Sequence, residues 1–348
     1  MSDIHIRKSG QTGRITFTRP RALNAMSYQM CLAIEDALDA WAQDDDVKMI
    51  VIDAQGEKAF CAGGDIAELY ETGTKGDFAY GQIFWADEYR MNAKMFEFPK
   101  PVASFMQGFT MGGGVGVGCH ASHRVVGDTS QIAMPECGIG LVPDVGGSHI
   151  LALAPGRMGE YLGLTAARLN AGDAIHTGFA DYYIPEANWP DLIAQLEDTG
   201  DWSLIDDAGV WVAPGPIAQQ ASNIDASFGG ESLRDIVNAL RVGTSDFAAE
   251  SLKKLSRNSP LAMGCALEII HRARAADNFR TALDREYRFT YRAMEHGDFL
   301  EGIRAQIIDK DRNPQWKHAI DALPDVAVSQ MLLPLGSAAL TFEKGETA

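Results

Sequence analysis

Two short segments that are almost wholly apolar constrain the fold of this chain more than any other feature. They are Met49–Ala54 and Val102–Met106, and His123–Gly127 is a third segment interpreted in the same way. Strands that are apolar on both faces are typical of a sheet covered on both sides. The three segments therefore predict short strands buried inside a larger structure.

Helical patterns separate these strands. In Asn24–Gln43 apolar residues recur every three or four positions, as expected of a helix with one buried face. Ile66–Glu71 predicts the start of a second helix, and Phe84–Phe96 predicts a third that ends before two prolines. Near the N-terminus, Ile4–Ile6 and Gly13–Phe17 predict two further strands. This alternation of strands and helices is typical of an α/β architecture.

The character of the chain changes from about Pro185 onward. Long amphipathic patterns such as Leu261–Ala275 and Asn278–Glu295 predict a helical C-terminal region. Residues 201–232 are rich in Gly, Pro, Ala and Ser and predict a connecting segment. We therefore expect two domains, an α/β core in residues 1–205 and a helical region in residues 206–348.

Composition narrows the classes of function. The chain has 348 residues and a net charge of −17, which disfavours nucleic acid as a partner because phosphate binding favours a basic surface. The five cysteines form no CxxC pair and the histidines have no metal-ligand spacing, so we expect neither a disulfide framework nor a metal site. The sequence shows no secretory signal and no apolar run long enough to span a membrane. It predicts a soluble cytoplasmic protein without a membrane partner.

A pair of glycines stands where a strand is expected to turn into a helix. The segment Ala59–Ile66 follows the predicted strand Met49–Ala54 and contains Gly63 and Gly64. Glycines at such a turn allow backbone N–H groups to point into a cleft, and the helix N-terminus adds a field that favours negative charge. The alternative is a tight turn in which Asp65 caps the helix.

A larger group of glycines, Met111–Gly118, follows the predicted strand Val102–Met106 and allows the same two interpretations, with close helix packing as the alternative. Gly116–Ala121 also fits a loose dinucleotide-binding pattern, with Glu136 at the spacing of a ribose-binding acid. Pro135 directly before Glu136 fits poorly with an acid that ends a central strand.

Two acids, Glu136 and Asp144, lie eight positions apart, and no charged residue separates them. An unpaired buried charge is costly, so acids in an apolar segment are either paired or functional. The structural alternative is a salt bridge, or a cap on a helix that begins near Gly146. From the residues alone both interpretations remain open.

The glycine segments and the acids described above resemble those of the crotonase (enoyl-CoA hydratase/isomerase) superfamily. The segments Phe60–Ile66 and Gln107–Gly114 are similar to its two oxyanion-hole segments. The resemblance covers roughly residues 5–195 and implies a spiral of ββα units and an acyl-CoA thioester substrate. It also implies an oxyanion hole formed by the backbone N–H groups of Gly64 and Gly113.

Within this superfamily the chain resembles the subgroup of 3-hydroxyisobutyryl-CoA hydrolases. Gly116 stands where a hydratase carries a glutamate, while Asp144, within Pro143–Gly147, matches an acid of the hydrolases. Glu88 matches a substrate-contacting acid of that subgroup. The segment from Asp298 to Trp316 resembles the terminal segment of the hydrolases, which extends the resemblance to nearly the whole chain.

The resemblance implies roles for five residues. Glu136 would be the base for a water molecule, or the nucleophile that forms a mixed anhydride. Asp144 would orient Glu136, the water or the substrate. Glu88 would bind the 3-hydroxyl group, and Ala62 and Asp65 would also contact the substrate.

The resemblance also implies that the only coenzyme is the CoA of the substrate, and that a trimer or hexamer of this chain can form. Two other functions remain as alternatives. A Δ3,Δ2-enoyl-CoA isomerase needs one acid near Glu136 and has little use for Asp144. A non-catalytic binding protein of the same fold would release no thiol from any acyl-CoA.

Overall fold

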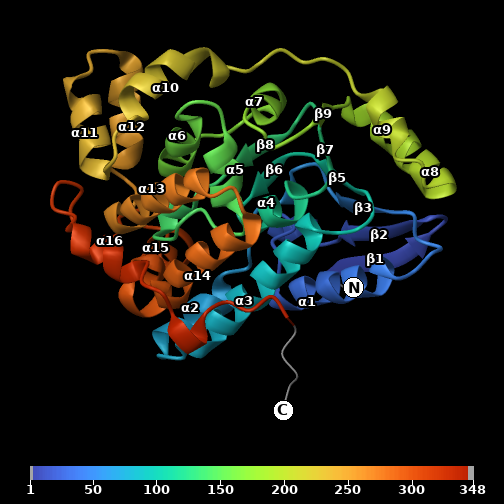
Figure 1. Ribbon diagram of the computed structural model, residues 1–348, viewed down its shortest axis with the longest axis horizontal. Helices are drawn as coiled ribbons and strands as arrows, with labels where there is room; N and C mark the ends of the chain where they lie inside the picture. The colour runs from blue at the N-terminus through green and yellow to red at the C-terminus, as the bar shows by residue number, and fades with distance from the viewer. Residues whose placement is uncertain (1–2, 344–348) are drawn as a thin grey trace. The chain divides into compact units, whose positions relative to one another are not determined.

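The computed structural model describes residues 3–343, drawn as a ribbon in Figure 1. These residues form two compact units. The first unit comprises residues 3–65, 90–133 and 168–219, and the second comprises residues 66–89, 134–167 and 220–343. Both units are built from three separate stretches of the chain. The predicted division into residues 1–205 and 206–348 describes two consecutive domains. The interleaved units do not test it, so it stays a prediction.

Two sheets lie in the first unit. The larger sheet has the strand order β1-β2-β3-β5-β7-β9, in which β1 and β2 are antiparallel and all other neighbours are parallel. The smaller sheet has the order β4-β6-β8 and is parallel. The bounds of the strands are β1 Ile4–Ser9, β2 Thr12–Phe17, β3 Met49–Ala54, β4 Ala59–Cys61, β5 Val102–Met106, β6 Phe109–Met111, β7 His123–Val126, β8 Gln131–Ala133 and β9 Tyr182–Tyr183.

The order of the strands along the chain produces a spiral. Each successive pair, β3 with β4, β5 with β6 and β7 with β8, places its first strand in the larger sheet and its second in the smaller sheet. A helix or a 3-10 turn follows each pair. The predicted spiral of ββα units is therefore confirmed.

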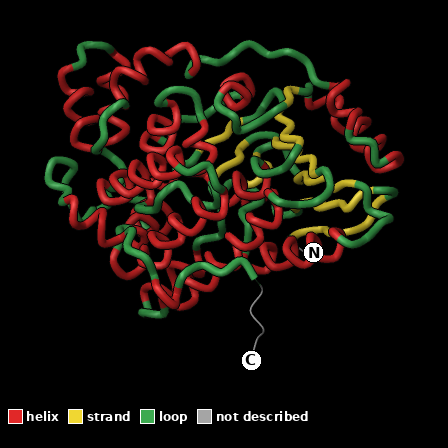
Figure 2. The backbone as a smooth tube through the Cα atoms, in the orientation of Figure 1, coloured by secondary structure: helices red, strands yellow, loops and turns green. Residues whose placement is uncertain are grey.

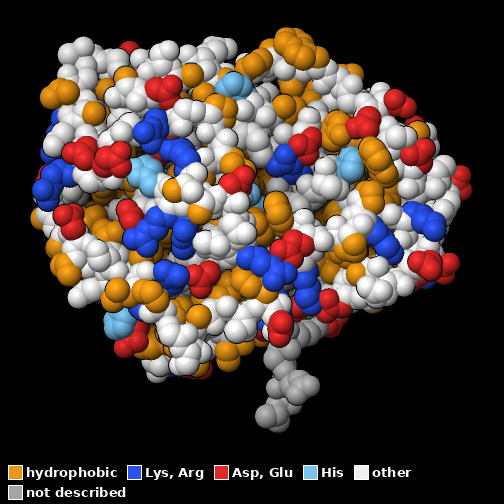
Figure 3. Space-filling view, in the orientation of Figure 1, with side chains coloured by type: hydrophobic (Ala, Val, Ile, Leu, Met, Phe, Trp, Pro, Cys, Tyr) orange, Lys and Arg blue, Asp and Glu red, His pale blue; other side chains and the backbone are white. Residues whose placement is uncertain are grey.

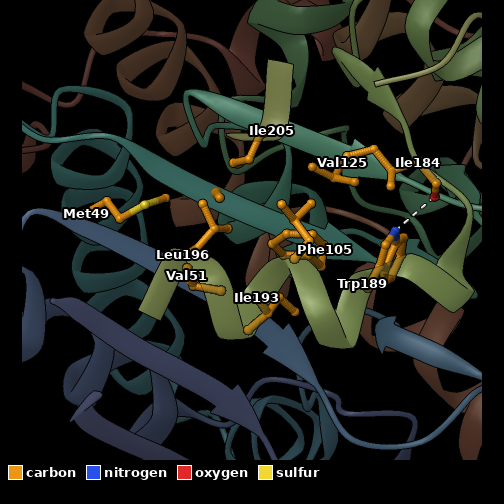
Figure 4. Close-up of a cluster of buried hydrophobic side chains, with 11 residues drawn as sticks. Met49, Val51, Phe105, Val125, Ile184, Trp189, Ile193, Leu196 and Ile205 are labelled. Atoms are coloured by element: carbon orange, nitrogen blue, oxygen red, sulfur yellow. Dashed lines mark hydrogen bonds between the residues drawn. The ribbon is translucent and has the colours of Figure 1, made fainter. Parts of the chain in front are cut away.

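Helices cover the larger sheet of the first unit. The helices of this unit are α1 Tyr28–Ala42, α4 Gly113–Gly118, α7 Ala171–His176, α8 Trp189–Thr199 and α9 Ser203–Ala208. Residues of α8 and α9 pack on the apolar side chains of β3, β5 and β7 (Figure 4). Trp189 packs edge-on against Phe105 at 5.4 Å between ring centroids, and its indole N–H donates to the carbonyl of Ile184 at 2.9 Å. The buried runs that predicted strands thus form the centre of this core.

The second unit is helical. Its elements are α2 Ala67–Thr74, the start of α3 Phe78–Phe96, the 3-10 helix η2 Glu136–Ile139, α5 Gly147–Leu153, α6 Met158–Thr165, α10 Ala221–Phe228, α11 Leu233–Val242, α12 Asp246–Leu255, α13 Pro260–Ala275, α14 Phe279–His296, α15 Phe299–Ile303 and α16 Asp325–Met331. Helix α13 is buried along most of its length and contacts α5, α6, α11, α14 and α16. The predicted C-terminal helices therefore occur close to their expected bounds. Figure 2 shows the helices of the chain in red and the strands in yellow.

The segment 201–232 differs from its prediction as a simple connector, because it includes α9 and α10. Helices in residues 3–343 are all too short or too polar to cross a membrane. On the face drawn in Figure 3, acidic and basic side chains are interspersed and not gathered by sign.

Candidate active site

Two glycine turns lie side by side in the first unit. Strands β4 and β6 are parallel neighbours, with Ala59 opposite Phe109, and each runs directly into a glycine turn. Carboxyl ends of parallel strands meet at one edge of a sheet, so the turns are adjacent. A Cβ atom on Gly63 would lie 3.6 Å from the carbonyl oxygen of Met111. The sheet thus brings together the two segments that carry Gly64 and Gly113.

The backbone N–H of Gly64 is an unused donor. Its neighbours are fixed, because the N–H of Ala62 donates to Leu23 at 3.0 Å and that of Asp65 donates to Met26 at 2.8 Å. No acceptor for the Gly64 N–H occurs among residues 3–343. A Cβ atom at this position would meet nothing within 4 Å, and the backbone is not left-handed. Neither packing nor conformation therefore requires a glycine here.

The N–H of Gly113 is unused for a different reason. Gly113 is the first residue of α4, and the first N–H groups of a helix have no partner within the helix. The described part of the chain offers this N–H no other acceptor. Gly114 is required by packing, because a Cβ atom there would collide with the carbonyl oxygen of Cys61. Two free donors on adjacent turns are the arrangement that an oxyanion hole needs.

The other predicted residues of this segment have ordinary surroundings. Ala62 is half-buried between β4 and the turn. The carboxylate of Asp65 accepts a hydrogen bond from the guanidinium of Arg19 at 3.1 Å. The N-cap position of α2 is occupied by Ile66, not by Asp65 as the structural alternative predicted.

Three predicted acids belong to the second unit, and all are buried. Glu88 lies on α3, Glu136 opens η2, and Asp144 lies in the loop before α5. Burial raises the pKa of Asp144 to about 7 and raises the pKa values of Glu88 and Glu136 well above their ordinary range. The charge of Asp144 adds to the rise in pKa at both glutamates, which shows that the three acids form one electrostatic group.

Glu136 has an unsatisfied carboxylate oxygen. Its Oε2 atom is buried and has no hydrogen-bond partner within residues 3–343. Buried polar atoms are nearly always paired, so an orphan calls for a ligand or water. The turn that carries Glu136 is held firmly, because a Cβ atom on Gly302 would collide with the backbone of Ile139 and one on Gly140 with that of Asp298.

Asp144 is held by a tyrosine and precedes a strained residue. The buried hydroxyl of Tyr89 donates to its carboxylate at 2.7 Å and lies 3.4 Å from the hydroxyl of Thr290. Val145 has a φ of +53°, a left-handed conformation that is strained for a β-branched residue. Neither Glu136 nor Asp144 forms a salt bridge in the described chain, which removes the first structural alternative.

The structure also shows two site residues that the sequence analysis missed. Tyr89 follows Glu88 directly but gave no signal of its own. The carboxylate of Glu286 accepts bonds from the N–H groups of Gly146 and Ser148, so it, and not Asp144, caps the start of α5. One sequence feature could have indicated Glu286, because it is an acid on the buried face of the predicted helix Asn278–Glu295.

Cofactor and metal patterns receive no support from the geometry. In a dinucleotide-binding pattern the ribose-binding acid ends a strand. Glu136 instead opens a 3-10 helix. Among residues 3–343 no group of three or more His, Cys, Asp or Glu side chains is arranged to hold a metal ion.

Comparison with known proteins is consistent with this arrangement. Residues 12–332 match the family described as enoyl-CoA hydratase/isomerase. The mitochondrial 3-hydroxyisobutyryl-CoA hydrolase of Gallus gallus is 33% identical over 97% of this chain and 90% of its own length. The corresponding protein of Rattus norvegicus is 35% identical over 98% of this chain and 91% of its own length.

Two solved structures share the fold across nearly the whole chain. A structure described as an enoyl-CoA hydratase from Rhodobacter sphaeroides 2.4.1 is 55% identical, with a TM-score of 0.95, covering 98% of this chain and 100% of that one. A structure described as a carnitinyl-CoA dehydratase from Mycobacterium thermoresistibile is 36% identical, with a TM-score of 0.94, covering 99% and 100%. With its spiral of ββα units and its full-length relatives, this chain belongs to the enoyl-CoA hydratase/isomerase family.

Proposed function

We propose that this chain hydrolyses the thioester of a short 3-hydroxyacyl-CoA, with 3-hydroxyisobutyryl-CoA as the substrate. The observation that carries the proposal is the unsatisfied, buried carboxylate of Glu136 in one electrostatic group with Asp144. Gly116 supports hydrolysis over hydration, because it leaves no acid where a hydratase carries one. The names of the relatives from Gallus gallus and Rattus norvegicus support the same reaction. With this substrate the reaction belongs to valine degradation.

The free N–H groups of Gly64 and Gly113 would bind the thioester oxygen. Attack on the carbonyl carbon moves negative charge to that oxygen, and donors already in place stabilise it without reorganisation. Removing one such donor from an enzyme typically costs about 3 kcal/mol in transition-state binding. Ala62 and Asp65, on the same turn as Gly64, would contact the substrate.

Glu136 would promote the attack by which an oxygen atom replaces the sulfur on the carbonyl carbon. As a general base, its carboxylate takes a proton from water while the water oxygen bonds to the carbonyl carbon, and the C–S bond then breaks to release CoA thiolate. As a nucleophile, the carboxylate itself bonds to the carbonyl carbon and expels CoA thiolate, leaving an anhydride that water hydrolyses. A pKa raised by burial makes this carboxylate a stronger base in either route.

Asp144 and Glu88 would assist Glu136. Asp144 would orient Glu136 and the attacking water, and its bond from Tyr89 fixes its own position. Glu88 would accept a hydrogen bond from the 3-hydroxyl of the substrate. Its burial disfavours the charged form, so a neutral hydroxyl is a more suitable partner for it than an ion.

Release of free thiol from 3-hydroxyisobutyryl-CoA tests the proposal. We expect turnover by the wild type and a loss of at least about 100-fold in kcat for Glu136→Gln. Glu160→Gln is a matched control, because Glu160 is also buried in the second unit but is bound by Arg157 and Arg274. Equal turnover by Glu136→Gln and the wild type, or no thiol release by the wild type, would refute the proposal.

A single turnover in heavy-oxygen water separates the two routes. Heavy oxygen in the carboxylate of Glu136 requires the anhydride, because only then does water reach the glutamyl carbon. Heavy oxygen in the acid product, with none in the enzyme, is the result expected of the general base.

Hydration of an enoyl-CoA is the second candidate function. The specific observation in its favour is the 55% identity to the structure described as an enoyl-CoA hydratase from Rhodobacter sphaeroides 2.4.1. Crotonyl-CoA distinguishes the two, because hydration removes the ultraviolet absorbance of the enoyl thioester and releases no thiol. A hydration rate above the rate of thiol release would favour this second function.

We further propose a cytoplasmic location and assembly into a trimer or hexamer. The location rests on the sequence alone, whereas the hydrolases of Gallus gallus and Rattus norvegicus are named as mitochondrial. The assembly rests on the resemblance to the superfamily. Light scattering of the purified protein measures the assembly directly, and a monomer would refute it.

A further inference from the structure

A fully buried carboxylate of helix α14 binds the backbone beside Asp144. Glu286 is 0% exposed and accepts hydrogen bonds from the N–H of Gly146 at 2.8 Å and the N–H of Ser148 at 3.0 Å. It also accepts a hydrogen bond from the hydroxyl of Ser148. One side chain thus engages three donors within the four residues that follow Asp144.

The loop from Asp144 to Gly147 needs such an anchor. Val145 has a left-handed backbone, which persists only where the surrounding structure fixes it. The N–H of Gly147 donates to the carbonyl of Asp144 at 2.7 Å, so a shift of Gly146 would be passed to Asp144. Glu286 binds on the far side of Val145 and holds the loop in the strained form.

A carboxylate is an expensive group for this purpose. Burial raises the pKa of Glu286 to about 8 despite the bonds from Ser148 and Gly146, and the charge of Asp144 adds to the rise. Caps from Asn or Ser are common at helix starts and avoid burying another acid beside a group of acids. The position of Glu286 therefore indicates a use beyond capping α5.

Helix α14 also reaches the side chain of Asp144. Thr290 lies one helical turn after Glu286, and its hydroxyl is 3.4 Å from that of Tyr89, which donates to Asp144. Residues four apart share a face of a helix. The same face of α14 therefore supports both the backbone and the carboxylate of Asp144.

We propose that Glu286 is a positioning residue for thioester hydrolysis, which holds the loop before α5 so that the carboxylate of Asp144 is aligned. This inference rests on the proposed function, in which Asp144 takes part in the reaction. Glu286 itself contacts the loop and not the substrate.

The variant Glu286→Gln tests the inference. A glutamine keeps the shape, but its amide nitrogen faces one of the two backbone N–H groups whichever way the amide is turned, so one of those bonds is lost. We expect kcat for 3-hydroxyisobutyryl-CoA to decrease about 10- to 100-fold, as small misplacements of a reacting group do, with KM within about twofold of wild type. An unchanged kcat would overturn the proposal.

Two further variants separate positioning from stability. Ser148→Ala removes only the hydroxyl donor and leaves both backbone bonds, so kcat should stay within about twofold of wild type. Glu286→Asp keeps the charge but is too short to engage both N–H groups. Its kcat should therefore fall below that of the wild type, but by less than the kcat of Glu286→Gln. If Glu286→Gln does not fold, wild-type kcat in Glu286→Asp overturns the proposal by itself.

A double-mutant cycle with Asp144→Asn gives the decisive readout. If Glu286 acts through Asp144, adding Glu286→Gln to Asp144→Asn should reduce kcat by less than about threefold further, whereas independent effects multiply. Multiplied losses would overturn the positioning role. A wild type that releases no thiol would refute the proposed function instead, and wild-type activity in Glu286→Gln alongside an inactive Asp144→Asn would refute only this inference.

Discussion

The carboxylate of Asp144 lowers the stability of the folded protein near neutral pH, so we expect Asp144→Asn to be more stable than the wild type. Burial is the largest cause of the raised pKa of this group, and the hydrogen bond from Tyr89 opposes the rise only in part. Asparagine has nearly the same shape and cannot ionise. Its side-chain oxygen can still accept the bond from Tyr89.

The size of the effect follows from the pKa in the two states. The pKa is 3.8 ordinarily and about 7 in the folded protein, which at about 1.36 kcal/mol for each pKa unit corresponds to about 4 kcal/mol. Because the folded state holds its proton more tightly, the wild type loses this stability as pH rises from about 4 to about 7. The asparagine variant lacks this loss, so its advantage should be about 4 kcal/mol at pH 8 and about 1.5 kcal/mol at pH 5.

Urea unfolding at pH 5 and pH 8, followed by tryptophan fluorescence, measures both values. Asp173→Asn is a matched control, because Asp173 is equally buried but accepts two backbone N–H bonds at 2.9 and 3.1 Å. The control should lose stability at both values of pH, since asparagine has one acceptor fewer. An Asp144→Asn variant that is less stable than the wild type at pH 8, or whose gain does not grow with pH, would refute the reasoning.

Three further variants test the site. In Tyr89→Phe the pKa of Asp144 should rise, because the lost bond favoured the ionised form, and the acidic limb of the pH profile of kcat/KM should move to higher pH. Gly64→Ala should keep the wild-type melting temperature, because open space surrounds this position, yet lose about tenfold in kcat/KM as the methyl group obstructs the substrate. Gly114→Ala should lower the free energy of unfolding by about 1–3 kcal/mol, measured in urea, because the new methyl group collides with Cys61.

Much of the fold could be predicted because it depends on local patterns. Strands Met49–Ala54 and Val102–Met106 occur at the predicted bounds, since burial on both faces leaves an apolar run in the sequence. The first helix begins at Tyr28, four residues later than predicted, because Met26 pairs with Gly64 in a backbone bridge. That pairing joins residues far apart in sequence, and no local pattern reveals it.

The residues of the candidate site also differ in whether the sequence could predict them. Glu136 and Asp144 could be found because an acid in an apolar segment stands out without any partner. The bonding partners of Tyr89 and Glu286 could not be predicted, because the bonds span 55 and 140 positions along the chain. Hydrogen-bond partners at such distances are set by tertiary packing, which single-sequence patterns do not contain.

The close contact of Gly302 with the turn that carries Glu136 has a consequence for biosynthesis. A ribosome adding about 5–20 residues per second reaches Gly302 roughly 160 residues after Ile139, on the order of 8–30 s later. During that interval the nascent chain already carries both acids but lacks Gly302 and Asp298, which close the turn. The growing polypeptide therefore cannot close the turn that carries Glu136 until both residues have been synthesised, and a chain truncated before Asp298 should leave that turn open.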